Sequence, residues 1–199
     1  MTASRSSIAP LALLGVALAA TGCRRADPVA EVASAPAAPL DRDRYRRPDL
    51  LVAALHFSPG AHVADVGAGD GYLTHRLAAR AGVHGDVVAT DIDRAALAHI
   101  GVSGPGEAPI AVQIVTPDEP GLETGFFDLI LLSEVDHYLP DRVAYLRKLA
   151  AALAPGGRIA ISNRRVHRAP ALEAAARAGL SPVFEYNGLP AHFLVEVQP

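Results

Sequence analysis

The segment His62–Tyr72, with the sequence HVADVGAGDGY, constrains the fold of this chain more than any other stretch. An apolar run, Val63–Val66, leads into three glycines at alternate positions, which are Gly67, Gly69 and Gly71. The apolar run predicts a strand, and glycine permits backbone conformations and close approaches that a side chain would block. Apolar residues spaced four apart then predict a helix whose first amide groups point at anything bound over the turn. The segment therefore predicts a strand, a turn and a helix around a ligand site.

The spacing of the glycines separates two kinds of nucleotide site. A dinucleotide-binding fold has the pattern G-x-G-x-x-G, which counted from Gly67 would place a glycine where this chain has Tyr72. The glycines instead run G-x-G-x-G with Asp65 two residues ahead, and this resembles motif I of class I S-adenosylmethionine-dependent methyltransferases. The resemblance implies that Asp65, Gly67, Gly69 and Gly71 bind S-adenosyl-L-methionine. A plain strand-to-helix turn and a nicotinamide oxidoreductase are the alternatives, the latter opposed by Tyr72.

Acidic residues end the next apolar run, Val87–Asp93. In an open parallel sheet ligands bind beyond the carboxyl ends of the strands, so we expect Asp91 beside the glycine turn. A carboxylate there can accept both hydrogen bonds of a ribose diol. The alternative is that Asp91 caps a helix, but Asp93, directly before a helical pattern, is better placed for that role.

A third strand is predicted at Ile110–Val115, and the residues after it include Asp118 between two prolines. In similar methyltransferases an acidic or polar residue at this place meets the adenine amino group. The resemblance therefore implies that Asp118 contacts adenine, and an ordinary turn is the alternative.

The most continuous apolar run, Phe126–Ser133, predicts a central strand covered on both faces. Its exit, SEVDH at 133–137, resembles the motif IV loop of class I methyltransferases, including a subgroup with a histidine in the loop. This implies that Ser133 binds the cofactor and that His137 is the candidate general base, which is needed only if the acceptor begins protonated. Alternatively, His137 merely packs or caps the loop. The L-x-P-G-G sequence at Leu153–Gly157 is a further family signature.

Alternating strand and helix patterns over residues 49–161 predict a doubly wound parallel sheet. The resemblance implies a Rossmann-like α/β fold of seven strands, and alternation in Val183–Tyr186 and His192–Val197 predicts a final antiparallel pair. The implied reaction is in-line attack of a substrate nucleophile on the sulfonium methyl group. Before the first strand, Tyr45 and Arg47 are candidates for a lid over the site, or else belong to a solvated charged cap.

Charge disfavours nucleic acid as a partner and leaves a small-molecule acceptor open. The formal net charge is -3 and no long basic run occurs, so nucleic acid is not expected as a partner. A basic cluster follows the fifth strand and either attracts an acidic substrate or belongs to a solvated loop. Its members are Arg164, Arg165, His167 and Arg168.

The amino terminus reads as an export signal. Arg5 precedes an apolar run at 10–20, which is too short for the roughly 20 residues that span a bilayer. The sequence that follows, ATGC ending at Cys23, resembles the lipobox of bacterial lipoproteins, and this implies a lipid anchor on Cys23. We therefore expect three parts: a lipoprotein signal peptide at 1–22, an Ala/Pro-rich tether at 23–40, and a class I methyltransferase domain at 41–199.

The implied location is the cell envelope, facing the periplasm. Arg24 follows the cysteine where lipoproteins retained in the inner membrane commonly have aspartate, so the outer membrane is favoured. An ordinary cleavage site is one alternative, and a misassigned start codon, which would leave the protein in the cytoplasm, is another. Because S-adenosylmethionine is made in the cytoplasm, an exported non-catalytic module that keeps the methyltransferase fold is the alternative function.

Overall fold

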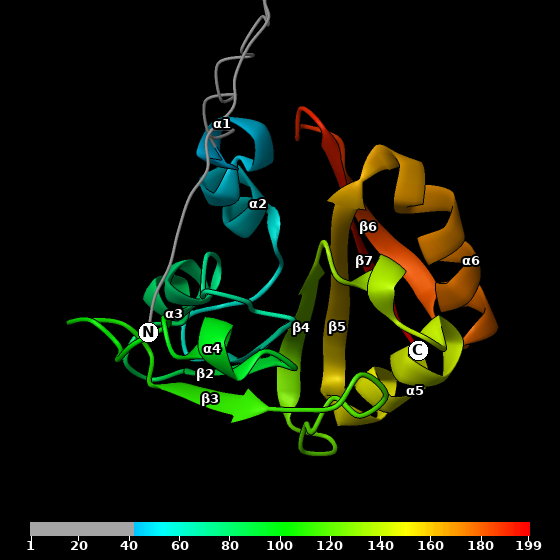
Figure 1. Cartoon of the computed structure of the whole chain (residues 1–199). Helices are drawn as coiled ribbons and strands as arrows, with labels where there is room; N and C mark the ends of the chain where they lie inside the picture. Colours follow the sequence, from blue (N-terminus) through cyan, green and yellow to red (C-terminus); the bar gives the residue numbers. More distant parts are fainter. Residues whose placement is uncertain (1–41) are drawn as a thin grey trace, which may run out of the picture. The chain divides into compact units, whose positions relative to one another are not determined.

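Seven strands form one sheet in the computed structural model, which describes residues 42–199. The order across the sheet is β3-β2-β1-β4-β5-β7-β6, and β7 runs antiparallel to both of its neighbours (Figure 1). This confirms the predicted doubly wound sheet with an antiparallel last strand. The predicted signal peptide, tether and Cys23 lie outside the described residues. The strands are β1 (His62–Val66), β2 (Asp86–Asp91), β3 (Ile110–Ile114), β4 (Phe127–Ser133), β5 (Leu153–Arg164), β6 (Ser181–Tyr186) and β7 (His192–Gln198).

Helices cover both faces of the sheet. One apolar cluster joins α5 and α6 to a face that includes Leu132, and another joins α2 and α3 to the opposite face, which includes Leu131 (Figure 1). Both leucines are fully buried, so β4 is covered on both sides, as predicted. In the described part of the chain, no helix has the length and apolar character needed to cross a membrane. The helices are α1 (Arg42–Arg46), α2 (Pro48–Ala54), α3 (Thr74–Ala81), α4 (Arg94–Leu97), α5 (Arg142–Ala152) and α6 (Arg168–Arg177), with 3-10 turns at Asp136–Tyr138 and Arg165–His167.

Asp93 and Asp141 cap the starts of helices α4 and α5. The Asp93 side chain accepts hydrogen bonds from two backbone amides at the start of α4, 2.8 and 3.2 Å away. Asp141 accepts one at the start of α5, 2.9 Å from the amide nitrogen of Ala144. These bonds satisfy amides that have no partner within the helix, which is why both acids mark helix starts.

Two elements differ from the sequence-based expectation. The sequence pattern predicts that Leu153–Arg158 turns into a strand at Ile159, whereas β5 already begins at Leu153 and its pairing with β4 is irregular between Leu153 and Arg158. A Cβ at Gly157 would press on the carbonyl oxygen of Phe127, so glycine lets this end of the strand close onto β4. The second difference is α1, which the sequence did not predict and which has no buried residue.

Candidate functional site

The three glycines of the turn have different physical roles. Gly69 has φ +57°, and a Cβ built there would meet nothing within 4 Å. A Cβ at Gly67 would instead collide with the side chain of Val135, and one at Gly71 would press on Ile100. Gly69 is therefore the position where a ligand can approach the backbone, whereas the other two glycines allow tight packing.

Asp91 stands at the carboxyl end of β2, beside the turn. Its Oδ2 accepts a hydrogen bond from the Gly69 amide at 2.8 Å, and its Oδ1 accepts one from the Asp93 amide at 2.9 Å. Each carboxylate oxygen keeps a second acceptor position, so two ribose hydroxyls can still bind. The structure thus brings Asp91 and Gly69 together as predicted, and the ribose role stays a prediction.

Beyond Asp91 lies a cavity of about 370 Å³ with a mostly apolar lining. A flat aromatic base suits such a slot, since apolar walls with a few polar groups are typical of nucleoside sites. Asp118 does not line it: the side chain is exposed, and its Oδ1 accepts a hydrogen bond from the Thr116 hydroxyl at 2.8 Å. Contact between Asp118 and adenine stays a prediction. The apolar lining consists of Val66, Ile92, Val115, Pro117, Val135, Leu139 and Tyr145.

A second cavity, of about 200 Å³, is lined by residues of the turn and has a more polar lining than the first. Its lining includes Asp65, Ser133 and the two arginines Arg42 and Arg46. Guanidinium groups suit a carboxylate and an acidic side chain suits an ammonium group, so the cavity fits the amino-acid end of the cofactor. The Arg46 guanidinium also donates to the Ser133 hydroxyl at 2.8 Å.

Asp65 lies buried beneath this cavity. Burial raises its pKa from 3.8 to about 6, although the Thr74 hydroxyl, which donates to Oδ2 at 2.7 Å, and the charge of Arg46 both oppose the shift. Asp65 is therefore placed where the motif I resemblance implies, and its contact with the cofactor stays a prediction.

Helix α1 closes over the glycine turn through Tyr72. The Tyr72 hydroxyl donates to Asp43 at 2.7 Å, and the guanidinium groups of Arg42 and Arg46 lie 4.3 and 4.8 Å from its ring centroid. Arg42 also forms an ion pair with Asp70 at 2.8 Å. Tyr72, which stands where a dinucleotide-binding motif would have a glycine, thus packs against α1.

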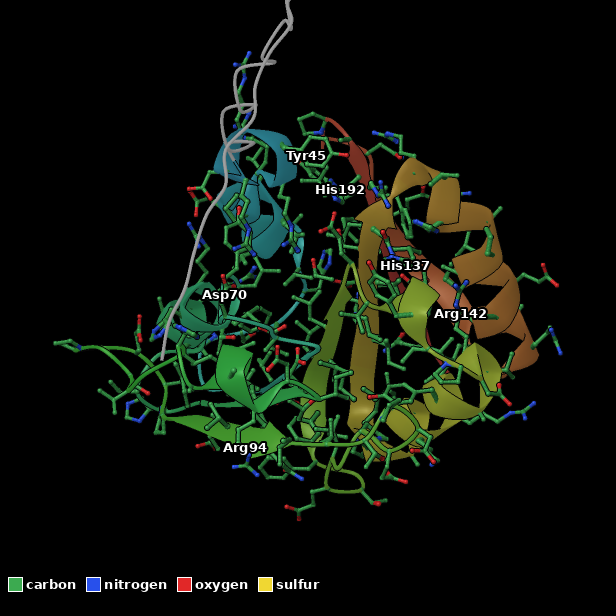
Figure 2. All side chains as sticks on the ribbon, in the orientation of Figure 1. Tyr45, Asp70, Arg94, His137, Arg142 and His192 are labelled. Atoms are coloured by element: carbon green, nitrogen blue, oxygen red, sulfur yellow. The ribbon has the colours of Figure 1, made fainter. Side chains whose placement is uncertain are left out.

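The two candidate lid residues have different positions. The ring of Tyr45 meets that of His192 edge-on, with centroids 5.2 Å apart, and Figure 2 shows the two labels side by side. Arg47 joins α1 to α2 with φ +48°, and its side chain is exposed. Of these two residues, Tyr45 is therefore the one whose side chain contacts His192.

The two cavities meet at Gly67, Glu134 and Val135, which line both of them. Glu134 directly follows β4, and its Oε1 lies 2.5 Å from Nε2 of His192 at the start of β7. This hydrogen bond is the main reason why the pKa of Glu134 lies below its usual range. The sequence-based prediction named neither Glu134 nor His192 as a site residue.

His137 lines neither cavity. Its Nδ1 lies 2.8 Å from Nδ2 of Asn163, and its ring stacks on that of His167 with centroids 4.3 Å apart. Burial, followed by the charge of His167, lowers the pKa of His137. In Figure 2 its label lies by the 3-10 turn after β4, away from Tyr45 and His192. Its role as base stays a prediction.

Asn163 determines which nitrogen of His137 carries the proton. Its Oδ1 accepts from the Arg164 amide at 2.7 Å, and its Nδ2 lies 2.6 Å from a carboxylate oxygen of Asp136, so the amide has one favourable orientation. Nδ2 then donates its second hydrogen to Nδ1 of His137, which places the proton of the neutral ring on Nε2. In this arrangement His137 has no free acceptor nitrogen.

Most of the basic cluster after β5 has structural partners. Arg168 forms two hydrogen bonds with Glu185, at 2.8 and 2.6 Å, and Arg165 donates to the carbonyl oxygen of Leu189 at 2.9 Å. These contacts hold the β5–α6 connection to the β6–β7 hairpin. Capture of an acidic substrate by the cluster stays a prediction.

Known proteins match both the sequence and the fold. A family model described as a methyltransferase domain matches residues 64–159. A solved S-adenosylmethionine-dependent methyltransferase from Aquifex aeolicus aligns with a TM-score of 0.71 and 18% identity, covering 78% of this chain and 91% of that one. The described residues therefore have the fold of S-adenosylmethionine-dependent methyltransferases, and residues 64–159 match a methyltransferase domain. Its cofactor is S-adenosyl-L-methionine.

Curated relatives are more similar in sequence but longer. A ubiquinone biosynthesis O-methyltransferase from Xanthomonas oryzae pv. oryzae is 33% identical over 149 residues, which cover 74% of this chain and 60% of the relative. A 27-O-demethylrifamycin SV methyltransferase from Amycolatopsis mediterranei is 30% identical over 151 residues, covering 70% and 52%. The chain thus spans 60% or less of the length of these two methyltransferases.

Proposed function

We propose that this protein transfers a methyl group from S-adenosyl-L-methionine to a hydroxyl oxygen of a small molecule. The observation that carries the proposal is the meeting of an apolar cavity and a polar cavity at Gly67 and Glu134. The apolar cavity suits adenosine and the polar one suits the amino-acid end, so the reactive middle of such a ligand belongs at their shared wall. The cofactor supplies an electrophilic methyl group there.

Oxygen is proposed as the acceptor atom because the names of two similar proteins specify O-methylation or an O-demethylated substrate. Both names also refer to small molecules. The chain's own contribution is to hold the acceptor oxygen in line with the methyl group, and such alignment can supply roughly 7 to 11 kcal/mol of barrier reduction in the best cases. A covalent nucleophile of the protein is not required.

We further propose that the mature protein is anchored to the outer membrane by lipid on Cys23 and faces the periplasm. The lipobox-like ATGC sequence supports this, as does the Ala/Pro-rich tether after it. The competing candidate is an exported non-catalytic module that keeps the methyltransferase fold. The open backbone at Gly69 and the available acceptor positions of Asp91 suit cofactor binding, which supports the enzyme, and turnover is the decisive measurement.

The test uses the full-length chain. Calorimetry should show binding of S-adenosylmethionine and S-adenosylhomocysteine in preference to NAD. Mass spectrometry should then show a mass gain of one methylene on at least one member of a panel of phenols, catechols and aliphatic alcohols. Absence of cofactor binding would contradict the proposed enzyme and favour the non-catalytic module, and binding without methyl transfer to any panel member would also favour that module.

A further inference from the structure

Glu134 has an unusual backbone conformation at the centre of the site. Its φ is +61°, and the only other non-glycine residue with positive φ among residues 42–199 is Arg47. A glutamate in this region costs free energy, and such conformations persist where surrounding contacts hold them, often at functional sites. Here the Glu134 amide donates to the carbonyl oxygen of Ser162 at 2.8 Å, which ties the residue to the end of β5. Glu134 in this conformation is one of the residues that line both cavities.

His192 forms a hydrogen bond with Oε1 of the Glu134 carboxylate. An ionised carboxylate only accepts hydrogen bonds, so the 2.5 Å contact requires that Nε2 of His192 carries a proton. The imidazole is 2% exposed, and the ring of Tyr45 packs against it edge-on. The orientation of the Glu134 side chain is therefore set by a buried, packed partner.

The other carboxylate oxygen keeps acceptor capacity. Oε2 of Glu134 lies 3.6 Å from Nε of Arg46, which is longer than a hydrogen bond. The positive groups that act on this carboxylate come from three elements: His192 at the start of β7, Arg46 of α1 and Arg164 at the end of β5. They favour the ionised form, so Oε2 is a negatively charged acceptor on a residue that lines both cavities.

We propose that Glu134 is the catalytic base of the methyl transfer and that His192 is its positioning residue. This rests on the proposed function and makes it more specific, because the acceptor is then a hydroxyl group that keeps its proton until methyl transfer. The acceptor oxygen forms a bond to the methyl carbon while the carbon–sulfur bond breaks, and sulfur takes that electron pair. The hydroxyl proton passes to Oε2 of Glu134 and from there to water.

A carboxylate of low pKa is sufficient for this step. The hydroxyl group becomes strongly acidic as its oxygen gains a bond to the methyl carbon. A weak base can therefore accept its proton during the transfer. His137 is less suited, because its Nδ1 is engaged by Asn163 and it lines neither cavity. The two candidate bases thus differ in position and can be separated by mutation.

The first experiment measures turnover of the full-length protein with a panel hydroxyl compound that the wild type methylates. Glu134→Gln keeps an oxygen that can accept from His192 but removes the base, and kcat should fall by about 100-fold or more. His192→Gln retains a side-chain N–H donor for Glu134 and should recover much of the activity that His192→Phe loses. Glu123→Gln, at an exposed position, is the matched control.

The acid limb of the pH profile provides a second readout. Loss of activity at low pH should follow Glu134, so the wild-type limb lies below the usual glutamate range and is absent in Glu134→Gln. His137→Ala should leave that limb in place. Equal kcat in wild type and Glu134→Gln, or loss of the limb only in His137→Ala, would overturn the assignment.

A binding measurement tests the same contact without turnover. In the complex with S-adenosylhomocysteine, catechol should bind more tightly than 1,2-dimethoxybenzene, because only catechol donates a hydroxyl proton to Glu134. Glu134→Gln should reduce this preference by about tenfold while changing the affinity for S-adenosylhomocysteine less than about twofold. No preference in the wild type would overturn the base assignment. Failure of the wild type to methylate any panel compound would instead contradict the proposed function, and the base assignment with it.

Discussion

The buried carboxylate of Asp65 lowers the free energy of unfolding of the domain at neutral pH. Its folded-state pKa, about 6, lies above the ordinary 3.8, chiefly because burial penalises the charged form. The folded state therefore holds the proton more tightly, and the stability that this group contributes falls as pH rises from about 4 to above 6. The shift corresponds to on the order of 3 kcal/mol of destabilisation at neutral pH and above.

Asp65→Asn should consequently stabilise the domain. Asparagine keeps an oxygen for the Thr74 hydroxyl and removes the buried charge. We expect the melting temperature at pH 8 to rise by on the order of 5 °C, with a much smaller gain at pH 4, where the wild type is protonated. Thermal unfolding at the two pH values checks this. An equal gain at both would show that ionisation is not the cause.

Asp91 should contribute to the affinity for the cofactor. Asp91→Ala removes the proposed acceptor of the ribose hydroxyls, and the loss of hydrogen bonds to a charged group costs on the order of 1.5 to 3 kcal/mol, or about tenfold or more in affinity. Calorimetry with S-adenosylhomocysteine measures the change. Asp86→Ala, at the amino end of the same strand, is the control and should bind like the wild type. Unchanged affinity in Asp91→Ala would contradict the ribose assignment.

The sequence alone predicts the positions of site residues that lie at the ends of predicted strands. Asp65 and Asp91 lie at the ends of apolar runs, and the ends of adjacent parallel strands meet at one edge of the sheet. Arg46 and His192 were missed because no local pattern connects them to that edge. Their place depends on how α1 and β7 pack, which is a tertiary property.

Helix α1 is an element held by side chains instead of by a core. It has no buried residue, and it contacts the glycine turn through the ring of Tyr72 and through the ion pair between Arg42 and Asp70. Burial, together with the hydrogen bond to Asp43, raises the pKa of Tyr72 to about 12, so its hydroxyl remains a donor at physiological pH. Tyr72 therefore contributes to the closure of α1 over the polar cavity, together with the Arg42–Asp70 ion pair and the Arg46–Ser133 hydrogen bond.

Tyr72→Ala should speed release of the cofactor product. It removes two cation–π contacts and one hydrogen bond, and each cation–π contact at an exposed site contributes about 0.5 to 1 kcal/mol. We expect the dissociation rate of S-adenosylhomocysteine to rise about fivefold or more in stopped-flow measurements. Tyr72→Phe retains the aromatic ring and should have a smaller effect. If both variants release the ligand at the wild-type rate, α1 does not control its exit.

Some helices and strands could be predicted from local sequence signals, whereas the start of β5 and helix α1 could not. Long apolar runs such as β4, and capped helices such as α5, carry their own periodic and capping signals. The start of β5 was misplaced because Pro155 and Gly156 indicate a turn by local pattern, whereas Leu153, ahead of them, already pairs with Phe127 of β4; the register is irregular between Leu153 and Arg158. Helix α1 has only five residues, most of them charged, and nothing in its sequence marks it as a helix.

At the scale of the whole molecule, the proposed envelope location conflicts with the need for a cofactor made in the cytoplasm. Cys23 is the only cysteine in the chain, so a thiol-specific reagent reports directly on whether it is acylated. In a bacterial host we expect the wild type in the membrane fraction, unlabelled by the reagent and beginning at Cys23.

Cys23→Ala should abolish acylation and release the protein from membranes, because each buried CH₂ group of an acyl chain contributes about 0.8 kcal/mol to membrane binding and the variant retains no acyl chain. Thr21→Ser, which leaves the cysteine and the small residue before it unchanged, is the matched control and should remain anchored. Fractionation and intact-mass analysis measure both variants. A wild type that retains Met1 and carries no lipid in its native host would overturn the export proposal, and it would also remove the cofactor-supply argument that favours a non-catalytic module.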